Sequence, residues 1–151
     1  SCYYDMRLSA FKVAISKRFA GSVPIIEYGG WPYVSSEQLG AKLMHKMLDE
    51  HPEVTAVIAT NDLMAIGVLN ALRDKKISVP DEVSILGFDN IQAATFVTPA
   101  LSTVAVPMDE LGEKAMDILE KLLKEEEVPM VQYLQTHIES RESLKQYTGQ
   151  P

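Results

Sequence analysis

The sequence predicts an α/β fold with a doubly wound, mostly parallel sheet flanked by helices. Two apolar runs rich in β-branched residues, 54–59 and 83–88, show little alternation, which is typical of parallel strands covered on both faces. Segments with a helical spacing of apolar residues stand before and after these runs. Strands and helices that alternate in this way favour right-handed crossovers and a doubly wound sheet.

Length and composition limit the possible function classes. The chain has 151 residues, 46% of them hydrophobic, which suits one domain with a sizeable core. Fourteen basic and twenty-one acidic residues give a net charge of -7, which argues against a nucleic-acid surface on this chain. No apolar run approaches the roughly 18 residues of a membrane span. The single Cys2 cannot form an internal disulfide, which fits a reducing cytoplasm, where we expect the protein.

Capping residues, breakers and apolar spacing assign the elements. In chain order we expect a helix over 3–19, a strand over 25–28, a helix over 36–50, a strand over 54–59, a helix over 62–75, a strand over 83–88, a brief strand over 103–106, a helix over 108–124 and a last strand over 131–138.

Local patterns support individual helices. Ser35 and Gln38 form a capping-box pattern at the start of the helix over 36–50. The helix over 108–124 has acidic residues in its first turn and lysines in its last, as the helix dipole favours. The expected buried stripes are Leu39, Leu43 and Met47 on the helix over 36–50, Ala65, Val68, Leu69 and Leu72 on the helix over 62–75, and Leu111, Ala115, Ile118, Leu119 and Leu122 on the helix over 108–124.

Three strand ends are candidates for a ligand site, because ligands of open α/β sheets bind outside the carboxyl ends of the strands. They are Gly30-Trp31, Thr60-Asn61-Asp62 and Asp89-Asn90. An indole face and polar side chains at one edge would suit a sugar, with Trp31 stacking on the ring and the amide and carboxylate bonding hydroxyls. Each residue also has a simpler interpretation: Asp62 or Asn61 caps the next helix, and Trp31 packs under a lid.

Longer stretches resemble a known family. The segment PEVTAVIATNDLMAIGVLNALRDKKISVPDEVSILGFDN, followed by TPALSTVAVPMDELGEKAMDIL, is similar to the effector-binding region of the lac-repressor (galactose-repressor) family of bacterial transcription regulators. The ND-x-MA-x-G elbow, the GFDN strand end and the P-x-L-(S/T)-T-V crossover occur in the right order and spacing. The resemblance extends from about Arg7 to Arg141. It implies one lobe of a type-I periplasmic-binding-protein-like fold.

The resemblance implies four ligand-binding residues: Arg7, Trp31, Asn61 and Asp89. Arg7 stands where the family's helix places an effector-contacting arginine, with Ala10 in place of the commoner glycine. Trp31 would stack on the effector, Asn61 would fix its orientation, and Arg7 and Asp89 would bond its hydroxyls. A solvated arginine near the helix start is the simpler interpretation of Arg7.

The resemblance also implies a homodimer. Its contacts would come from the helix after the ND elbow and from the segment near 96–103. The interface candidates are Ile66, Leu69, Asn70, Phe96 and Leu101. The alternative for Ile66 and Phe96 is that they pack inside the chain.

The implied domain organisation assigns residues 1–104 and 130–140 to the carboxyl-terminal lobe of an effector-binding domain. Residues 105–129 would form a crossover and a helix that normally packs on an amino-terminal lobe absent from this sequence, and 141–151 would be a polar tail. The helix-turn-helix headpiece is also absent, so operator DNA would be contacted only through a headpiece outside this sequence.

The implied function is effector sensing in a bacterial repressor. A small molecule, by default a carbohydrate such as a pentose or hexose, would drive lobe closure, which repositions the DNA headpieces of a dimer. A periplasmic sugar-binding protein of a transporter shares the fold and is the main alternative. A dimerisation fragment with no ligand of its own is the third.

We expect no enzyme activity, cofactor or metal. His45 and Asp49 stand four apart on one helix, but His51 and His137 lack the spacing to complete a ligand set with them. The sequence has neither a G-x-S-x-G elbow nor a phosphate-binding G-x-x-x-x-G-K-(S/T) loop.

Overall fold

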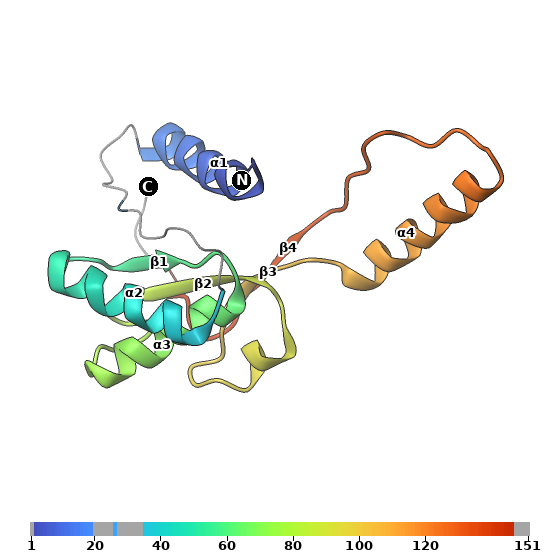
Figure 1. Cartoon of the computed structure of the whole chain (residues 1–151). Coiled ribbons are helices and arrows are strands. Elements are labelled where there is room, and N and C mark those ends of the chain that lie inside the picture. Colours follow the sequence, from blue (N-terminus) through green and yellow to red (C-terminus); the bar gives the residue numbers. More distant parts are fainter. Residues whose placement is uncertain (1, 20–25, 27–34, 147–151) are drawn as a thin grey trace. The chain divides into compact units, whose positions relative to one another are not determined.

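The computed structural model describes residues 2–19, 26 and 35–146, and within the first helix it describes side chains from Arg7 onward. The chain forms two compact units, residues 1–34 and 35–151. The first unit contains helix α1 (Cys2–Phe19), close to the expected 3–19. The second unit contains the sheet and the other helices of the described residues (Figure 1).

In the second unit, strands and helices alternate along the chain. The elements are α2 (Glu37–Glu50), β1 (Ala56–Ile58), α3 (Asp62–Asp74), β2 (Ser84–Asp89), the 3-10 helix η1 (Gln92–Thr95), β3 (Ser102–Ala105), α4 (Met108–Leu123) and β4 (His137–Glu139). The strand order is β1-β2-β3-β4; β1, β2 and β3 are parallel, and β4 runs antiparallel to β3. The predicted α/β fold with a mostly parallel sheet is confirmed.

The strand register places the carboxyl ends of the parallel strands at one edge of the sheet. Ile58 of β1 pairs with Leu86, and Asp89 at the end of β2 pairs with Ala105 at the end of β3. The segments that leave β1, β2 and β3 therefore start from the same edge, where ligands of such sheets bind.

The core lies between α3 and the sheet. Helix α3 packs against β2, and α2 packs against α3. The expected stripe of α3 is confirmed, because Ala65, Val68, Leu69 and Leu72 are all buried. Ile85 of β2 and Leu101 before β3 complete this core and are fully buried. Burial of these apolar side chains is the main driving force for folding of this unit.

The start of α2 differs from the prediction by one residue. Its N-cap is Ser36, whose Oγ accepts a hydrogen bond from the Leu39 backbone N–H at 3.1 Å. Ser35, the residue of the predicted capping box, instead accepts a hydrogen bond from the Asn61 side chain. Either of the two successive serines could have capped the helix. Because Ser35 bonds to Asn61, the cap is Ser36.

Two glycines allow α2 and α3 to approach closely. A Cβ on Gly40 would lie 2.2 Å from the Met64 carbonyl oxygen, and a Cβ on Gly67 would lie 2.0 Å from the Glu37 carbonyl oxygen. The contact face of α2 is therefore centred on Gly40 and Met44, which are buried. The predicted stripe does not coincide with this face, since its members are only half-buried: Leu39, Leu43 and Met47.

Strand β1 was expected to be covered on both faces. In the described part of the chain it is an end strand that pairs only with β2, and Ile58 is 50% exposed. The strand expected over 25–28 falls outside the described residues, apart from Ile26, which is in neither a helix nor a strand.

The last strand is shorter than the expected 131–138. It pairs with β3 only over His137–Glu139, and the pairing stops where His137 lies opposite Ala105. Two residues further along, Pro107 has no N–H to donate to a ladder. Residues 131–136 therefore have no partner strand among the described residues.

The chain after β4 does not behave as the polar tail expected from residue 141. Ser143 is fully buried; its hydroxyl donates to the Ile85 carbonyl at 2.7 Å and accepts from the Ser102 backbone N–H at 2.8 Å. The Lys145 backbone N–H donates to the Ser84 hydroxyl at 3.1 Å. Residues 141–145 thus fasten the start of β2 to the start of β3.

Helix α4 has an apolar side that the described residues do not cover. None of its residues is buried against the described part of the chain, and Leu111, Leu119 and Leu122 are 46%, 49% and 54% exposed. Figure 1 shows the helix joined to β3 and β4 by two extended segments. Among the described residues, the predicted burial of its stripe (Leu111, Ala115, Ile118, Leu119 and Leu122) is wrong, because periodicity identifies an apolar side but not what covers it.

The close approach of α2 and α3 can be tested with alanine. Gly67→Ala is expected to destabilise the chain by about 3 kcal/mol, since the new methyl group would overlap the α2 backbone. Urea unfolding followed by circular dichroism measures the change. Gly112→Ala is the matched control in α4, where a Cβ meets nothing within 4 Å, and its urea midpoint should be no lower than that of the parent. Equal midpoints for the two variants would show that the helices do not touch at Gly67.

Candidate functional site

Two of the four predicted ligand-binding residues lie at the carboxyl edge of the sheet. Asn61 follows β1 and immediately precedes α3, and Asp89 is the last residue of β2, the strand next to β1. Both side chains are half-buried. The sheet therefore brings an amide and a carboxylate, from segments far apart in the sequence, to neighbouring positions on one edge.

Asn61 is the N-cap of α3. Its Oδ1 accepts a hydrogen bond from the Met64 backbone N–H at 2.9 Å, and its Nδ2 donates to the Ser35 hydroxyl. The capping interpretation therefore holds for Asn61 rather than for Asp62. An amide has two N–H groups and two acceptor lone pairs, so capping does not exhaust the capacity of Asn61 for a ligand.

Asp62, the next residue, points into the protein and is 0% exposed. Its Oδ1 accepts from the Thr103 hydroxyl at 2.6 Å, and its Oδ2 accepts from the Ile91 backbone N–H at 2.9 Å. Gly87 leaves room for this carboxylate, because a Cβ there would lie 2.1 Å from Oδ1. Asp62 thus ties the start of α3 to β3 and to the segment after β2.

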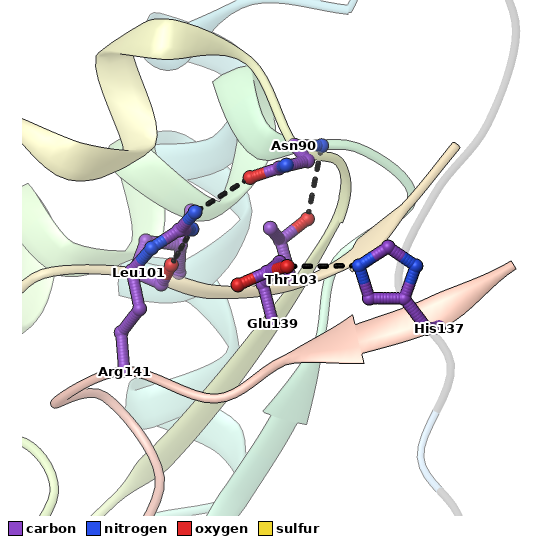
Figure 2. Close-up of polar contacts among 6 residues, drawn as sticks. All are labelled: Asn90, Leu101, Thr103, His137, Glu139 and Arg141. Carbon is purple, nitrogen blue, oxygen red and sulfur yellow. Dashed lines mark hydrogen bonds and ion pairs between the residues drawn. The ribbon is translucent and has the colours of Figure 1, made fainter. Parts of the chain in front are cut away.

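The chain leaves β2 through a turn with two left-handed residues, Asp89 (φ 106) and Asn90 (φ 59). We call residues 89–91 the Asp89 turn. Asp and Asn adopt positive φ more readily than other residues with a side chain. The Asn90 backbone N–H donates to the Thr103 hydroxyl at 3.3 Å, and the Asn90 Oδ1 accepts from Arg141 at 2.6 Å (Figure 2). The turn is therefore held from β3 and from the segment after β4.

Arg141 makes three of the contacts in this region. Its Nη2 donates to Asn90, and its Nη1 donates to the Leu101 carbonyl at 2.7 Å (Figure 2). Its backbone N–H donates to the Ser102 hydroxyl at 2.8 Å. Sequence reasoning used Arg141 only as the end of the family resemblance and missed this role, as it missed the inward carboxylate of Asp62. The glycine of GFDN was the available signal for Asp62, because it marks a close approach of another group to the backbone.

The other two predicted ligand-binding residues do not belong to the second unit, which contains this edge. Arg7 is exposed on α1 and belongs to the first unit. Trp31 lies outside the described residues. Their part in the site stays a prediction.

Three of the five predicted interface residues lie in this chain's own core. Ile66 and Leu69 are each 6% exposed and Leu101 is 0% exposed, so their side chains cannot form a surface for a second copy. The reason is that α3 is covered both by α2 and by the sheet. The packing alternative is correct for Ile66 but not for Phe96, which is 75% exposed. Asn70, half-buried, and Phe96 remain interface candidates.

The described residues contain no group of three or more His, Cys, Asp or Glu side chains placed to hold a metal ion. The described helices include none with the length and apolar character needed to cross a membrane.

Residues 1–144 match the family model of a periplasmic-binding-protein-like domain. The chain belongs to this family. Catabolite control protein A of Priestia megaterium is 36% identical over 107 residues, which are 70% of this chain and 32% of that protein. The chain thus spans about a third of the length of that protein.

Solved structures agree with the match. The Escherichia coli transcriptional repressor ascG superposes with a TM-score of 0.79 and 31% identity, over 95% of this chain and 51% of that one. A LacI family transcriptional regulator from Arthrobacter sp. FB24, in complex with lactose, has a TM-score of 0.68 and 33% identity, over 73% of this chain and 42% of that one. Within the periplasmic-binding-protein-like family, the chain is of the LacI type, which confirms the predicted resemblance. The two solved structures are named as a transcriptional repressor and a transcriptional regulator.

The buried carboxylate of Asp62 can be tested by its removal. Asp62→Ala is expected to destabilise the chain by about 3 kcal/mol, because the Thr103 hydroxyl loses its acceptor and the Ile91 N–H is left unpaired inside the protein. Urea unfolding measures the loss. Asp74→Ala, at the exposed last residue of α3, is the control and should change stability by less than about 0.5 kcal/mol. An Asp62→Ala variant as stable as this control would contradict the assigned role.

Proposed function

We propose that the chain forms one half of an effector-binding cleft in a LacI-type transcriptional regulator, and that the effector is a carbohydrate. The observation that supports this proposal is the position of Asn61 and Asp89 at the carboxyl ends of neighbouring parallel strands. A carboxylate accepts hydrogen bonds from hydroxyls, and an amide both accepts and donates, which suits the adjacent hydroxyls of a sugar. The lactose bound to the Arthrobacter relative supports the same ligand class.

Arg7 and Trp31 complete the proposed site. The indole of Trp31 would stack on the C–H face of a sugar ring, and the guanidinium of Arg7 would donate to its hydroxyls. One carboxylate and one guanidinium balance in charge, which favours an uncharged polyol over a phosphorylated sugar. A single half-cleft leaves the ligand open to water, so this chain alone should bind it weakly.

The proposed mechanism is closure of two lobes on the effector. Residues 1–104 and 130–140 would form the carboxyl-terminal lobe, and an amino-terminal lobe would supply the other wall of the cleft. An effector that binds the closed form more tightly than the open form shifts the population toward closure. In a homodimer this shift would move DNA-binding headpieces, which is how a chain with a net charge of -7 would control operator DNA without binding it.

The exposed apolar side of α4 supports this organisation. In an amphipathic helix such a stripe is normally buried against another element. Here Leu111, Leu119 and Leu122 are about half exposed, and the described residues supply nothing to cover them. We assign residues 105–129 as the crossover that delivers α4 to the amino-terminal lobe. The proposal gives the chain no catalytic step, and it places the protein in the cytoplasm, where operator DNA lies.

Effector binding tests the assigned site. The full-length protein encoded by the gene that contains this sequence is screened by thermal shift against uncharged mono- and disaccharides, beginning with lactose, and the sugar that raises its Tm most is titrated calorimetrically. Asp89→Asn keeps a residue that tolerates positive φ but removes the charge, and it should weaken binding by about tenfold or more, as should Trp31→Ala.

Asp81→Asn is the matched control, since Asp81 is exposed and precedes β2, at the opposite edge of the sheet. It should bind the sugar as the parent does. Unchanged affinity in both Asp89→Asn and Trp31→Ala would overturn the site.

The role of α4 is tested by comparing this chain with the full-length protein. Leu119→Lys preserves helix propensity and should change the stability of this chain by less than about 0.5 kcal/mol, because the side chain is already 49% exposed. In the full-length protein the same change would bury a lysine against the other lobe and should cost about 2 kcal/mol in urea unfolding.

Glu113→Lys, on the polar side of α4, should be neutral in both proteins. If Leu119→Lys were equally neutral in the full-length protein, α4 would not pack on an amino-terminal lobe.

A further inference from the structure

The Asp89 turn needs support from its surroundings. Two successive non-glycine residues with positive φ, Asp89 and Asn90, form a conformation that side-chain-bearing residues populate sparsely. Such a conformation persists only where neighbouring groups fix it. The direction of the Asp89 carboxylate depends on the backbone of this turn, so the groups that fix the turn also orient the carboxylate.

The first support comes from inside the fold. The Thr103 hydroxyl accepts from the Asn90 N–H at 3.3 Å and donates to Asp62, and Asp62 accepts from the Ile91 N–H at 2.9 Å. These bonds fix the backbone of the turn after Asp89. They do not hold the Asn90 side chain.

The second support comes from outside the core and is made by Arg141. One guanidinium nitrogen donates to the Asn90 Oδ1 at 2.6 Å while the other terminal nitrogen donates to the Leu101 carbonyl at 2.7 Å (Figure 2). A guanidinium is planar and its donors are fixed relative to one another, so anchoring at Leu101 sets where Asn90 must lie. A lysine ammonium on a flexible stem lacks this geometry.

We propose that Arg141 is a positioning residue for the effector site. It holds Asn90, and through Asn90 the left-handed backbone of Asp89, in the orientation that presents the Asp89 carboxylate at the sheet edge. Arg141 does not contact the effector in this arrangement. The inference rests on the proposed function in one respect, that Asp89 binds the effector.

A simpler role for Arg141 is to fasten the segment after β4 to β3, through its bonds to Leu101 and Ser102. That role predicts a loss of stability with no particular effect on the turn. The two roles differ in what they predict for the amides of the turn, for effector affinity and for variants of Asn90.

The first measurement uses this chain without any ligand. Amide hydrogen exchange followed by NMR should show faster exchange at Asn90 and Ile91 in Arg141→Ala, by about fivefold or more, because the turn opens locally. Arg141→Lys should not restore protection. Lys145→Ala is the matched control, since Lys145 donates to the Asp81 carbonyl at 3.2 Å, away from the turn. Unchanged exchange at both amides in Arg141→Ala would overturn the inference.

The second measurement uses the full-length protein and the sugar selected by thermal shift. Arg141→Ala should weaken binding by about tenfold and Lys145→Ala by less than about twofold. Asn90→Gly tolerates positive φ and removes the side chain, and it should weaken binding by a similar factor. The double variant Arg141→Ala/Asn90→Gly should lose no more affinity than either single variant, because the two residues act through one hydrogen bond.

The outcomes separate the inference from the proposed function. If Asp89→Asn weakens binding and Arg141→Ala does not, the site stands and the positioning role is wrong. Additive losses in the double variant would also contradict that role. If no sugar binds, or Asp89→Asn has no effect, the proposed site fails, and the hydrogen exchange alone then decides whether Arg141 holds the turn.

Discussion

The structure around the candidate site depends on the buried carboxylate of Asp62. One oxygen accepts from the Thr103 side chain on β3, and the other accepts from the backbone of Ile91 after β2. Because a charged group without partners is costly inside a protein, these bonds define where the three segments lie relative to one another. Gly87 is part of the same constraint, since any side chain there would displace the carboxylate. Asp62 of the ND elbow therefore fixes the relative positions of the segments at the carboxyl end of the sheet.

At this edge, one residue of each adjacent pair is held by the fold, and the other is available to a ligand. Asn61 caps α3 at the half-buried rim, while Asp62 is fully buried. In the Asp89 turn, the Asn90 backbone N–H donates to the Thr103 hydroxyl, the Asn90 Oδ1 accepts from Arg141, and Asp89 is the last residue of β2. In each pair, hydrogen bonds to the rest of the fold fix one residue, Asp62 or Asn90. The side chain of its neighbour, Asn61 or Asp89, thereby has a defined direction. A ligand site gains from this arrangement because less order has to be imposed when the ligand binds.

The sequence predicted features that depend on local patterns of residues. It did not predict features that depend on which other element packs against them. The stripe of α3 and the edge that joins Asn61 to Asp89 follow from periodicity and from strand order. The contact face of α2 did not, because it is set by the close approach at Gly40. The interface candidate Leu69 was drawn from the same apolar stripe that forms the core, and Ile66, outside that stripe, is buried as well. Asp62 was missed because a capping pattern does not say which of two polar residues turns inward.

The side of α4 that the described residues leave exposed is connected through the chain to the Asp89 turn. The segment that leaves α4 returns as β4, and two residues after β4 the guanidinium of Arg141 reaches Asn90. β4 pairs with β3 over three residues, His137–Glu139. Few hydrogen bonds therefore hold the segment that connects α4 to Arg141. In the proposed regulator, a lobe that packs on α4 and an effector that binds Asp89 would therefore act on the two ends of one segment. Coupling between sites requires that both ligands favour the same arrangement of a shared element, and the segment from α4 to Arg141 is the element that this chain offers.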